Sequence, residues 1–151
     1  MIIHLISNSS NSPNKIIKCP MPKDEKKIYD IEERSAKFGE DVIDWVKKLP
    51  SNDITKRLIP QAVGAATSIG SNYCEADCAE SNKDFIHKMS IANKEAKESK
   101  HFIRMLSKAC SEQIFEGRRL WKEAHELNLI LTTIIKKAKK TEESKESDKN
   151  N

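Results

Sequence analysis

The sequence predicts an all-α protein, folded as an antiparallel up-down-up-down four-helix bundle. The main observation is that four segments carry apolar residues at alternating steps of three and four, the spacing of one helix face, with short polar turns between them. The 151 residues also include only four glycines and five prolines, which argues against a turn-rich β fold. This length fits one domain, and the hydrophobic content of 37% allows a single core.

The first helix is predicted to begin at Asp30, because Asp is a favoured N-cap and Glu33 follows three residues later. Before it, residues 1–29 are rich in Asn, Ser, Pro and Lys and are predicted to form a mobile N-terminal arm. Pro50 ends the helix, after a heptad stripe of Ile31, Ser35, Phe38, Val42, Trp45 and Leu49.

The second helix has a possible cap at Asp53 and contains Pro60, so it either kinks there or restarts with Pro60 in its first turn. Gly64 and Gly70 lie inside it at a cost of ~1 kcal/mol each relative to Ala, which indicates close packing or simple tolerance. Its core stripe comprises Ile59, Ala62, Val63, Ala66, Ile69, Tyr73 and Ala76. A parallel row of smaller and polar side chains comprises Ala65, Ser68, Asn72 and Glu75.

The third helix is predicted to begin after Ser81, an N-cap residue with Asp84 three positions later. Its core stripe comprises Phe85, Met89, Ala92, Ala96, Ser99, Ile103, Leu106 and Cys110. A second row beside this stripe contains two carboxylates among apolar residues and comprises Ile91, Glu95, Glu98, Phe102, Met105 and Ala109.

The fourth helix follows a predicted connection over residues 111–117. Its stripe comprises Leu120, Ala124, Leu127, Leu131, Ile134 and Ala138, flanked by Trp121, Ile130 and Ile135. Lysines in its last turn suit the negative end of the helix dipole. The bundle is therefore predicted to span residues 30–140, and the polar residues 141–151 are predicted to be a disordered tail.

Composition excludes several classes of protein. The opening MIIHLIS is too short for a signal-peptide core, and no apolar run reaches the ~20 residues of a membrane span. The four cysteines show no disulfide framework, which favours a cytoplasmic protein with reduced thiols. With 27 basic and 23 acidic residues the net charge is only +4, which permits an acidic partner without requiring one. We predict no cofactor, no membrane partner and no small-molecule substrate.

A metal-binding or enzymatic bundle is the alternative reading. Glu98 and His101 have the Glu-x-x-His spacing of a carboxylate-bridged metal site, and Glu75 and Glu95 could add ligands. Such sites need the motif on two helices, and a second Glu-x-x-His is missing from the sequence. A structural zinc site at the helical pair Cys74 and Cys78 would need two more ligands, for which the candidates are His87 and Cys110.

Two groups of polar residues are candidates for function. Asn72, Glu75, Glu95 and Glu98 flank the apolar stripes of consecutive helices and are predicted to form a polar network that fixes helix register, or a contact between subunits. Basic residues that could contact nucleic-acid phosphates are Lys56, Arg57, Arg118, Arg119, Lys122, Lys136 and Lys137. Only 5% of residues are aromatic and most Phe and Trp residues fall on core stripes, so the sequence does not predict a base-stacking platform.

The chain resembles a known family over roughly residues 30–140. The family is that of the bacterial 23S rRNA-intervening-sequence (S23) proteins, to which the accessory variability proteins of diversity-generating retroelements are related. The matching residues are Gln61, Ala65, Ala66, Thr67, Ser68, Ile69, Asn72, Glu75, Ala76, Ser81, Asp84, Phe85, Ala92, Glu95, Ala96 and Glu98. The later segment KEAHELNLILTTIIKKAKK is similar to the last helix of that family.

The resemblance implies an antiparallel four-helix bundle that assembles as a homopentameric ring and has no enzymatic activity. The retroelement relatives bind nucleic acid and a reverse transcriptase. We therefore expect a non-enzymatic, oligomeric interaction protein that associates with RNA or with a nucleic-acid-binding protein. This chain departs from the strongly basic members of the group, because its excess charge is only +4 and lies partly in the terminal segments.

Overall fold

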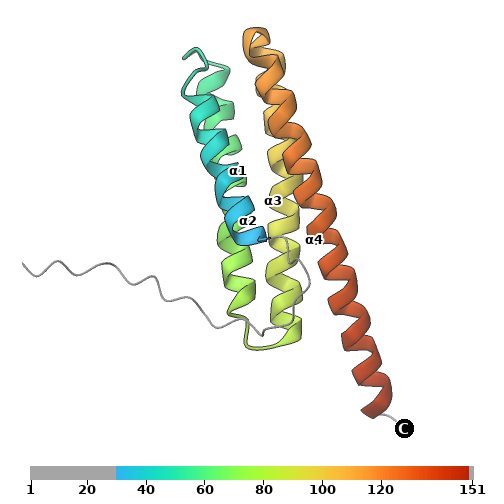
Figure 1. Ribbon diagram of the computed structural model, residues 1–151. Helices are drawn as coiled ribbons and strands as arrows, with labels where there is room; N and C mark the ends of the chain where they lie inside the picture. Colours follow the sequence, from blue (N-terminus) through green and yellow to red (C-terminus); the bar gives the residue numbers. More distant parts are fainter. Residues whose placement is uncertain (1–29, 150–151) are drawn as a thin grey trace, which may run out of the picture.

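The computed structural model describes residues 30–149. Four α-helices follow one another as α1 (Ile31–Val46), α2 (Thr55–Asp77), α3 (Asn82–Ala109) and α4 (Ile114–Lys149), with a short 3₁₀ turn, η1 (Ser111–Gln113), before α4. Successive helices run in opposite directions and pack side by side (Figure 1). The predicted four-helix bundle is therefore confirmed. The predicted arm at 1–29 lies outside the described residues.

Helix α1 forms as its sequence predicts. The carboxylate of Asp30 accepts a hydrogen bond from the backbone N–H of Glu33 at 3.0 Å, which satisfies one of the unpaired donors of the first turn. All six residues of the heptad stripe are buried, including Phe38 and Trp45 at 1% exposure each. The helix ends at Val46, and the buried side chain of Leu49 extends the core into the following loop.

Helix α2 differs from the prediction at its start. Asn52, rather than Asp53, supplies the cap, because its side-chain oxygen accepts hydrogen bonds from the N–H groups of Ile54 and Thr55, both at 3.0 Å. The buried hydroxyl of Thr55 donates to the carbonyl of Pro50 at 2.6 Å, which ties the loop to the helix. One helix runs through Pro60, so a restart at that residue is excluded.

Helices α3 and α4 form a long hairpin. Ser81 caps α3 by accepting a hydrogen bond from the N–H of Asp84 at 3.1 Å, as predicted. Helix α4 begins at Ile114, so the connection is shorter than the expected 111–117. Gly117 therefore lies inside the helix instead of in a turn. A Cβ at this glycine would lie 2.0 Å from Ser107 Oγ and 3.0 Å from Trp45 Cζ2, so the missing side chain permits the close approach of α4 to both neighbours.

Helix α4 continues to Lys149, through residues for which the sequence predicted a disordered tail. The segment from Thr141 onward is rich in Lys and Glu, which are good helix formers, and it contains no Pro or Gly to stop the helix. In Figure 1 this part of α4 extends past the turn between α2 and α3. At its beginning this part is also tied to α3, because the amide of Asn82 donates to the carboxylate of Glu142 at 2.7 Å.

Candidate functional site

The four predicted polar residues do not form a network with one another. Within residues 30–149 each has its own environment: the amide of Asn72 donates to the carbonyl of Ser68 at 2.9 Å, and Glu75 pairs with Lys88 at 2.5 Å. Glu98 pairs with Lys94 at 3.3 Å along α3. Burial raises the pKa of Glu95, and the charge of Glu98 raises it further. A contact of these residues with a second subunit stays a prediction.

The ion pair between Glu75 and Lys88 joins α2 to α3. In antiparallel helices a step back along one is matched by an equal step forward along the other. Counting seven residues along each helix from this pair leads to Ser68 on α2 and Glu95 on α3. The two rows described in the sequence therefore lie on neighbouring helices, and Glu95 is half-buried on α3.

The structure does not assemble the residues of the metal-binding alternative. His101 is exposed, and its ring packs edge-on against Phe102 at a centroid distance of 5.3 Å. Glu75 and Glu98 are engaged with lysines. Cys110 is buried at the end of α3, whereas Cys74 is exposed on α2. In the described part of the chain no three His, Cys, Asp or Glu side chains come together in a group that could hold a metal ion.

The basic candidates are all exposed but do not form one patch. Lys56 and Arg57 lie in the first turn of α2, and Arg118 and Lys122 lie near the start of α4. Both helices begin at the same end of the bundle (Figure 1). Lys136 and Lys137 lie several turns further along α4, and they are separated from the others by about 20 Å or more at 1.5 Å per residue.

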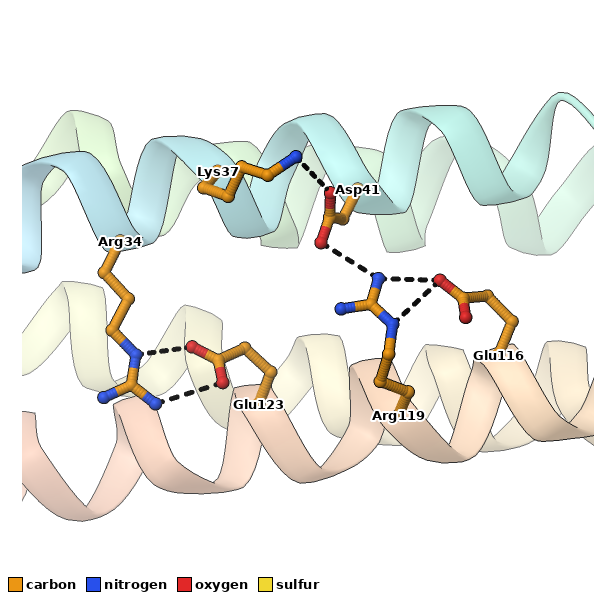
Figure 2. Close-up of polar contacts among 6 residues, drawn as sticks. All are labelled: Arg34, Lys37, Asp41, Glu116, Arg119 and Glu123. Atoms are coloured by element: carbon orange, nitrogen blue, oxygen red, sulfur yellow. Dashed lines mark hydrogen bonds and ion pairs between the residues drawn. The ribbon is translucent and has the colours of Figure 1, made fainter.

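Among contacts within residues 30–149, Arg119 is the one basic candidate with acidic partners. Its guanidinium group lies 2.9 Å from Asp41 on α1 and 2.6 Å from Glu116 on its own helix (Figure 2). Lys37 reaches the other carboxylate oxygen of Asp41 at 2.7 Å. The hydrogen bonds from Lys37 and then Arg119 hold the pKa of Asp41 below its usual value. Arg119 therefore joins α1 to α4 through its guanidinium group.

A second arginine joins the same two helices. Arg34 on α1 contacts both carboxylate oxygens of Glu123 on α4, at 2.5 and 3.0 Å, as Figure 2 shows. It also contacts Glu126 one turn later, at 2.6 Å. Bidentate arginine–carboxylate pairs fix orientation as well as distance. This contact is not predictable from the sequence, because a pair 89 residues apart in the chain leaves no local pattern.

A polar cluster between α3 and α4 was also not among the sequence-based predictions. The amide of Asn128, which is only 8% exposed, donates to the side-chain oxygen of Asn93 at 2.5 Å. The amide of Asn93 donates in turn to the hydroxyl of Thr132 at 3.2 Å. A signal was present in the sequence, since Asn128 and Thr132 directly follow the core residues Leu127 and Leu131.

A groove of about 450 Å³ lies where the end of α3 meets the start of α4. Its lining residues come from one face of each helix and combine cationic, hydroxyl and apolar side chains. They are Arg104, Ser107, Lys108 and Ser111 on one side, and Ile114, Gly117, Arg118 and Trp121 on the other. Of the predicted basic candidates, Arg118 alone lines this groove.

Comparison with known proteins adds family information. A family model described as 23S rRNA-intervening sequence protein matches residues 27–131. Among solved structures, the chain is similar to a protein of unknown function from the S23 ribosomal protein family of Bacteroides thetaiotaomicron, with 28% identity and a TM-score of 0.62. That similarity covers 70% of this chain and 98% of the other. No curated protein matches the chain significantly.

Proposed function

Because the chain belongs to the family of 23S rRNA-intervening sequence proteins, we propose that it is a non-enzymatic, homo-oligomeric interaction protein that associates with RNA. The family resemblance expected from the sequence is thereby confirmed. The proposal includes a homopentamer and a cytoplasmic location. No described helix combines the length and the apolar character needed to cross a membrane.

The observation that carries self-association is a pair of exposed large apolar side chains on α4. Phe115 is 81% exposed and Leu129 is 53% exposed, and the two lie 14 residues apart, so that they share one helix face. Lys122 lies midway between them and is also exposed. Burying a large apolar side chain against a second subunit contributes about 1.5–3 kcal/mol. Charged residues commonly flank such apolar contacts between helices of an assembly and form ion pairs across them.

The mass of the particle in solution tests this part. A pentamer has five times the chain mass of 17.2 kDa, and we expect that mass by light scattering at micromolar concentration. Leu129→Glu should lower it, because the change places a carboxylate in the apolar contact. Ser90→Glu, at an exposed position on α3, is the control and should leave the mass unchanged, because it lies on another helix. A monomeric wild-type protein would overturn the proposal of self-association.

RNA association is supported by the family description and by the exposed basic residues at the shared start of α2 and α4. Phosphate contacts release counterions, so RNA affinity should fall steeply as salt rises. The test is a titration of labelled RNA at several salt concentrations. An absence of binding at ~50 mM salt, where phosphate contacts are strongest, would refute the association with RNA and leave self-association to stand on its own test.

A further inference from the structure

The groove between α3 and α4 has an unusual charge environment for this molecule. Arg104, Lys108 and Arg118 line it, all three are exposed, and no carboxylate belongs to its lining. Within residues 30–149 no acidic side chain pairs with any of the three. This contrasts with Arg34 and Arg119, which are both held by carboxylates. The three positive charges are thus concentrated in one hollow without local neutralisation, which attracts anions.

The spacing of these cations favours a chain of anions over a single one. Arg104 and Lys108 lie one turn apart on α3, about 6 Å along the helix axis. Lys100 precedes them by a further turn, so three cations follow one line of this helix. Arg118 faces them from α4 across the groove. A strand with a phosphate at each repeat can meet such a line several times.

The groove also has an apolar wall. Trp121 and Ile114 are both half-buried and both line it. The indole of Trp121 is held in place, because it stacks on His125 at a centroid distance of 5.5 Å and lies 5.1 Å from the ammonium group of Lys100. Lys100 also lies 3.1 Å from His125, so the three side chains form one packed group. A fixed indole presents an aromatic surface at little entropic cost.

We propose that this groove binds a nucleotide of single-stranded nucleic acid, with phosphates at Arg104, Lys108 and Arg118 and the base packed against Trp121 and Ile114. The inference rests on the proposed RNA association and names its site. The combination of cations with an aromatic wall is that of single-strand binding sites. A duplex does not fit this description, since its bases are stacked inside and cannot reach an aromatic wall. Ser111 supplies a hydroxyl group for the sugar and phosphate oxygens, whereas the hydroxyl of Ser107 donates to the carbonyl of Ile103 and can only accept a hydrogen bond from the nucleotide.

The test is the affinity of the full chain for a labelled 12-nucleotide oligouridine RNA and its oligodeoxyuridine counterpart, measured by fluorescence anisotropy. The double variant Arg104→Ala/Arg118→Ala should bind both about tenfold more weakly at ~50 mM salt. It should also reduce the slope of log affinity against log salt by about 1.4, because each lost phosphate contact on a single strand contributes about 0.7. The control Lys139→Ala/Lys140→Ala removes the same charge from exposed positions far along α4 and should change affinity less than twofold.

A second readout reports on the base. Binding of the oligonucleotide should quench the fluorescence of Trp121, and the variant Trp121→Phe should lose that quenching while Trp45, at 1% exposure, remains as an unquenched reference. Circular dichroism confirms that each variant is folded. Quenching that persists in Trp121→Phe would place the base elsewhere and overturn the proposal.

Each of the following outcomes would contradict the proposed nucleotide site. If Arg104→Ala/Arg118→Ala binds the probes as tightly as the wild type does, the groove is not the binding site, while the association with RNA stands. If the wild type binds neither probe, the groove and the RNA association both fail. A change in particle mass in Arg104→Ala/Arg118→Ala would identify the groove as a contact between subunits and overturn the assignment. Competition by polyglutamate as effective as that by oligouridine would show a general anion site, which equally contradicts it.

Discussion

Replacing Gly117 by Ala should destabilise the protein, although the same change normally stabilises a helix. Ala is preferred to Gly in a helix interior by about 1 kcal/mol. Here the added methyl group would lie 2.0 Å from Ser107 Oγ, 3.1 Å from Ser107 Cβ and 3.0 Å from Trp45 Cζ2. The hydroxyl can rotate away only by giving up its hydrogen bond to the carbonyl of Ile103 at 2.7 Å. Trp45 is 1% exposed and cannot move without disturbing the core.

The expected change in the free energy of unfolding follows from a comparison with a second glycine, Gly64. Gly64 has no atom within 4 Å of an added Cβ, so Gly64→Ala should gain the full ~1 kcal/mol of helix preference. Overpacking of a filled core costs about 1–3 kcal/mol, so Gly117→Ala should be ~0–2 kcal/mol less stable than the wild type. The helix-preference contribution cancels between the two variants, which leaves a difference of about 1–3 kcal/mol due to packing.

Urea unfolding followed by circular dichroism measures this difference, at one protein concentration because an assembly makes stability concentration-dependent. The background variant Ser107→Ala removes the 2.0 Å contact and should relieve part of the cost of Gly117→Ala. If Gly117→Ala were as stabilising as Gly64→Ala, the claim that α4 approaches α3 and Trp45 closely at this glycine would be wrong.

Three further changes test the polar contacts. Asn128→Ala should lower the free energy of unfolding by about 1–3 kcal/mol, because the half-buried side-chain oxygen of Asn93 loses its shorter hydrogen bond and keeps only the contact with Thr132 at 3.4 Å; urea unfolding measures this. Lys37 and Arg119 lower the pKa of Asp41, so the stability it contributes is complete above its ordinary value of 3.8 and is lost as pH falls through the lower folded value. Asp41→Asn should therefore reduce the melting temperature at pH 7 and have little effect near pH 2. Burial raises the pKa of Glu95 above 4.5, so ionisation opposes folding as pH rises through that range. Glu95→Gln should raise the melting temperature at pH 7 but not at pH 3, and an equal rise at both would contradict this account.

The fold followed from local patterns that the structure reproduces. The heptad stripes of α1 and α3 are buried along their whole length except at Phe85, which is half-buried. The caps at Asp30 and Ser81 depend only on residues three positions apart, which a sequence displays directly. Helix ends were less predictable. Gly117 suggested a turn, whereas packing against Trp45 requires a glycine inside the helix.

The candidate site was less predictable because it depends on contacts between helices. Arg118 and Arg119 are neighbours in the sequence with the same chemistry, yet Arg118 faces the groove and Arg119 faces the carboxylate of Asp41. Adjacent residues point about 100° apart around a helix. Which of the two arginines faces the groove and which faces Asp41 is known only once α1 is placed beside α4. Trp121 was assigned to the flank of a core stripe, and the structure shows that its half-exposed side forms the groove wall.

The pairs that join α1 to α4 have a consequence for the order of folding. Arg34 and Glu123 are 89 residues apart and Arg119 and Asp41 are 78 apart, so these contacts close the largest loops in the bundle. Closing a longer loop costs more chain entropy. The hairpins α1–α2, α2–α3 and α3–α4 can form without closing these long loops. We expect α1 and α4 to meet after the rate-limiting barrier. Mutations at Arg34 would then accelerate unfolding while leaving the folding rate nearly unchanged.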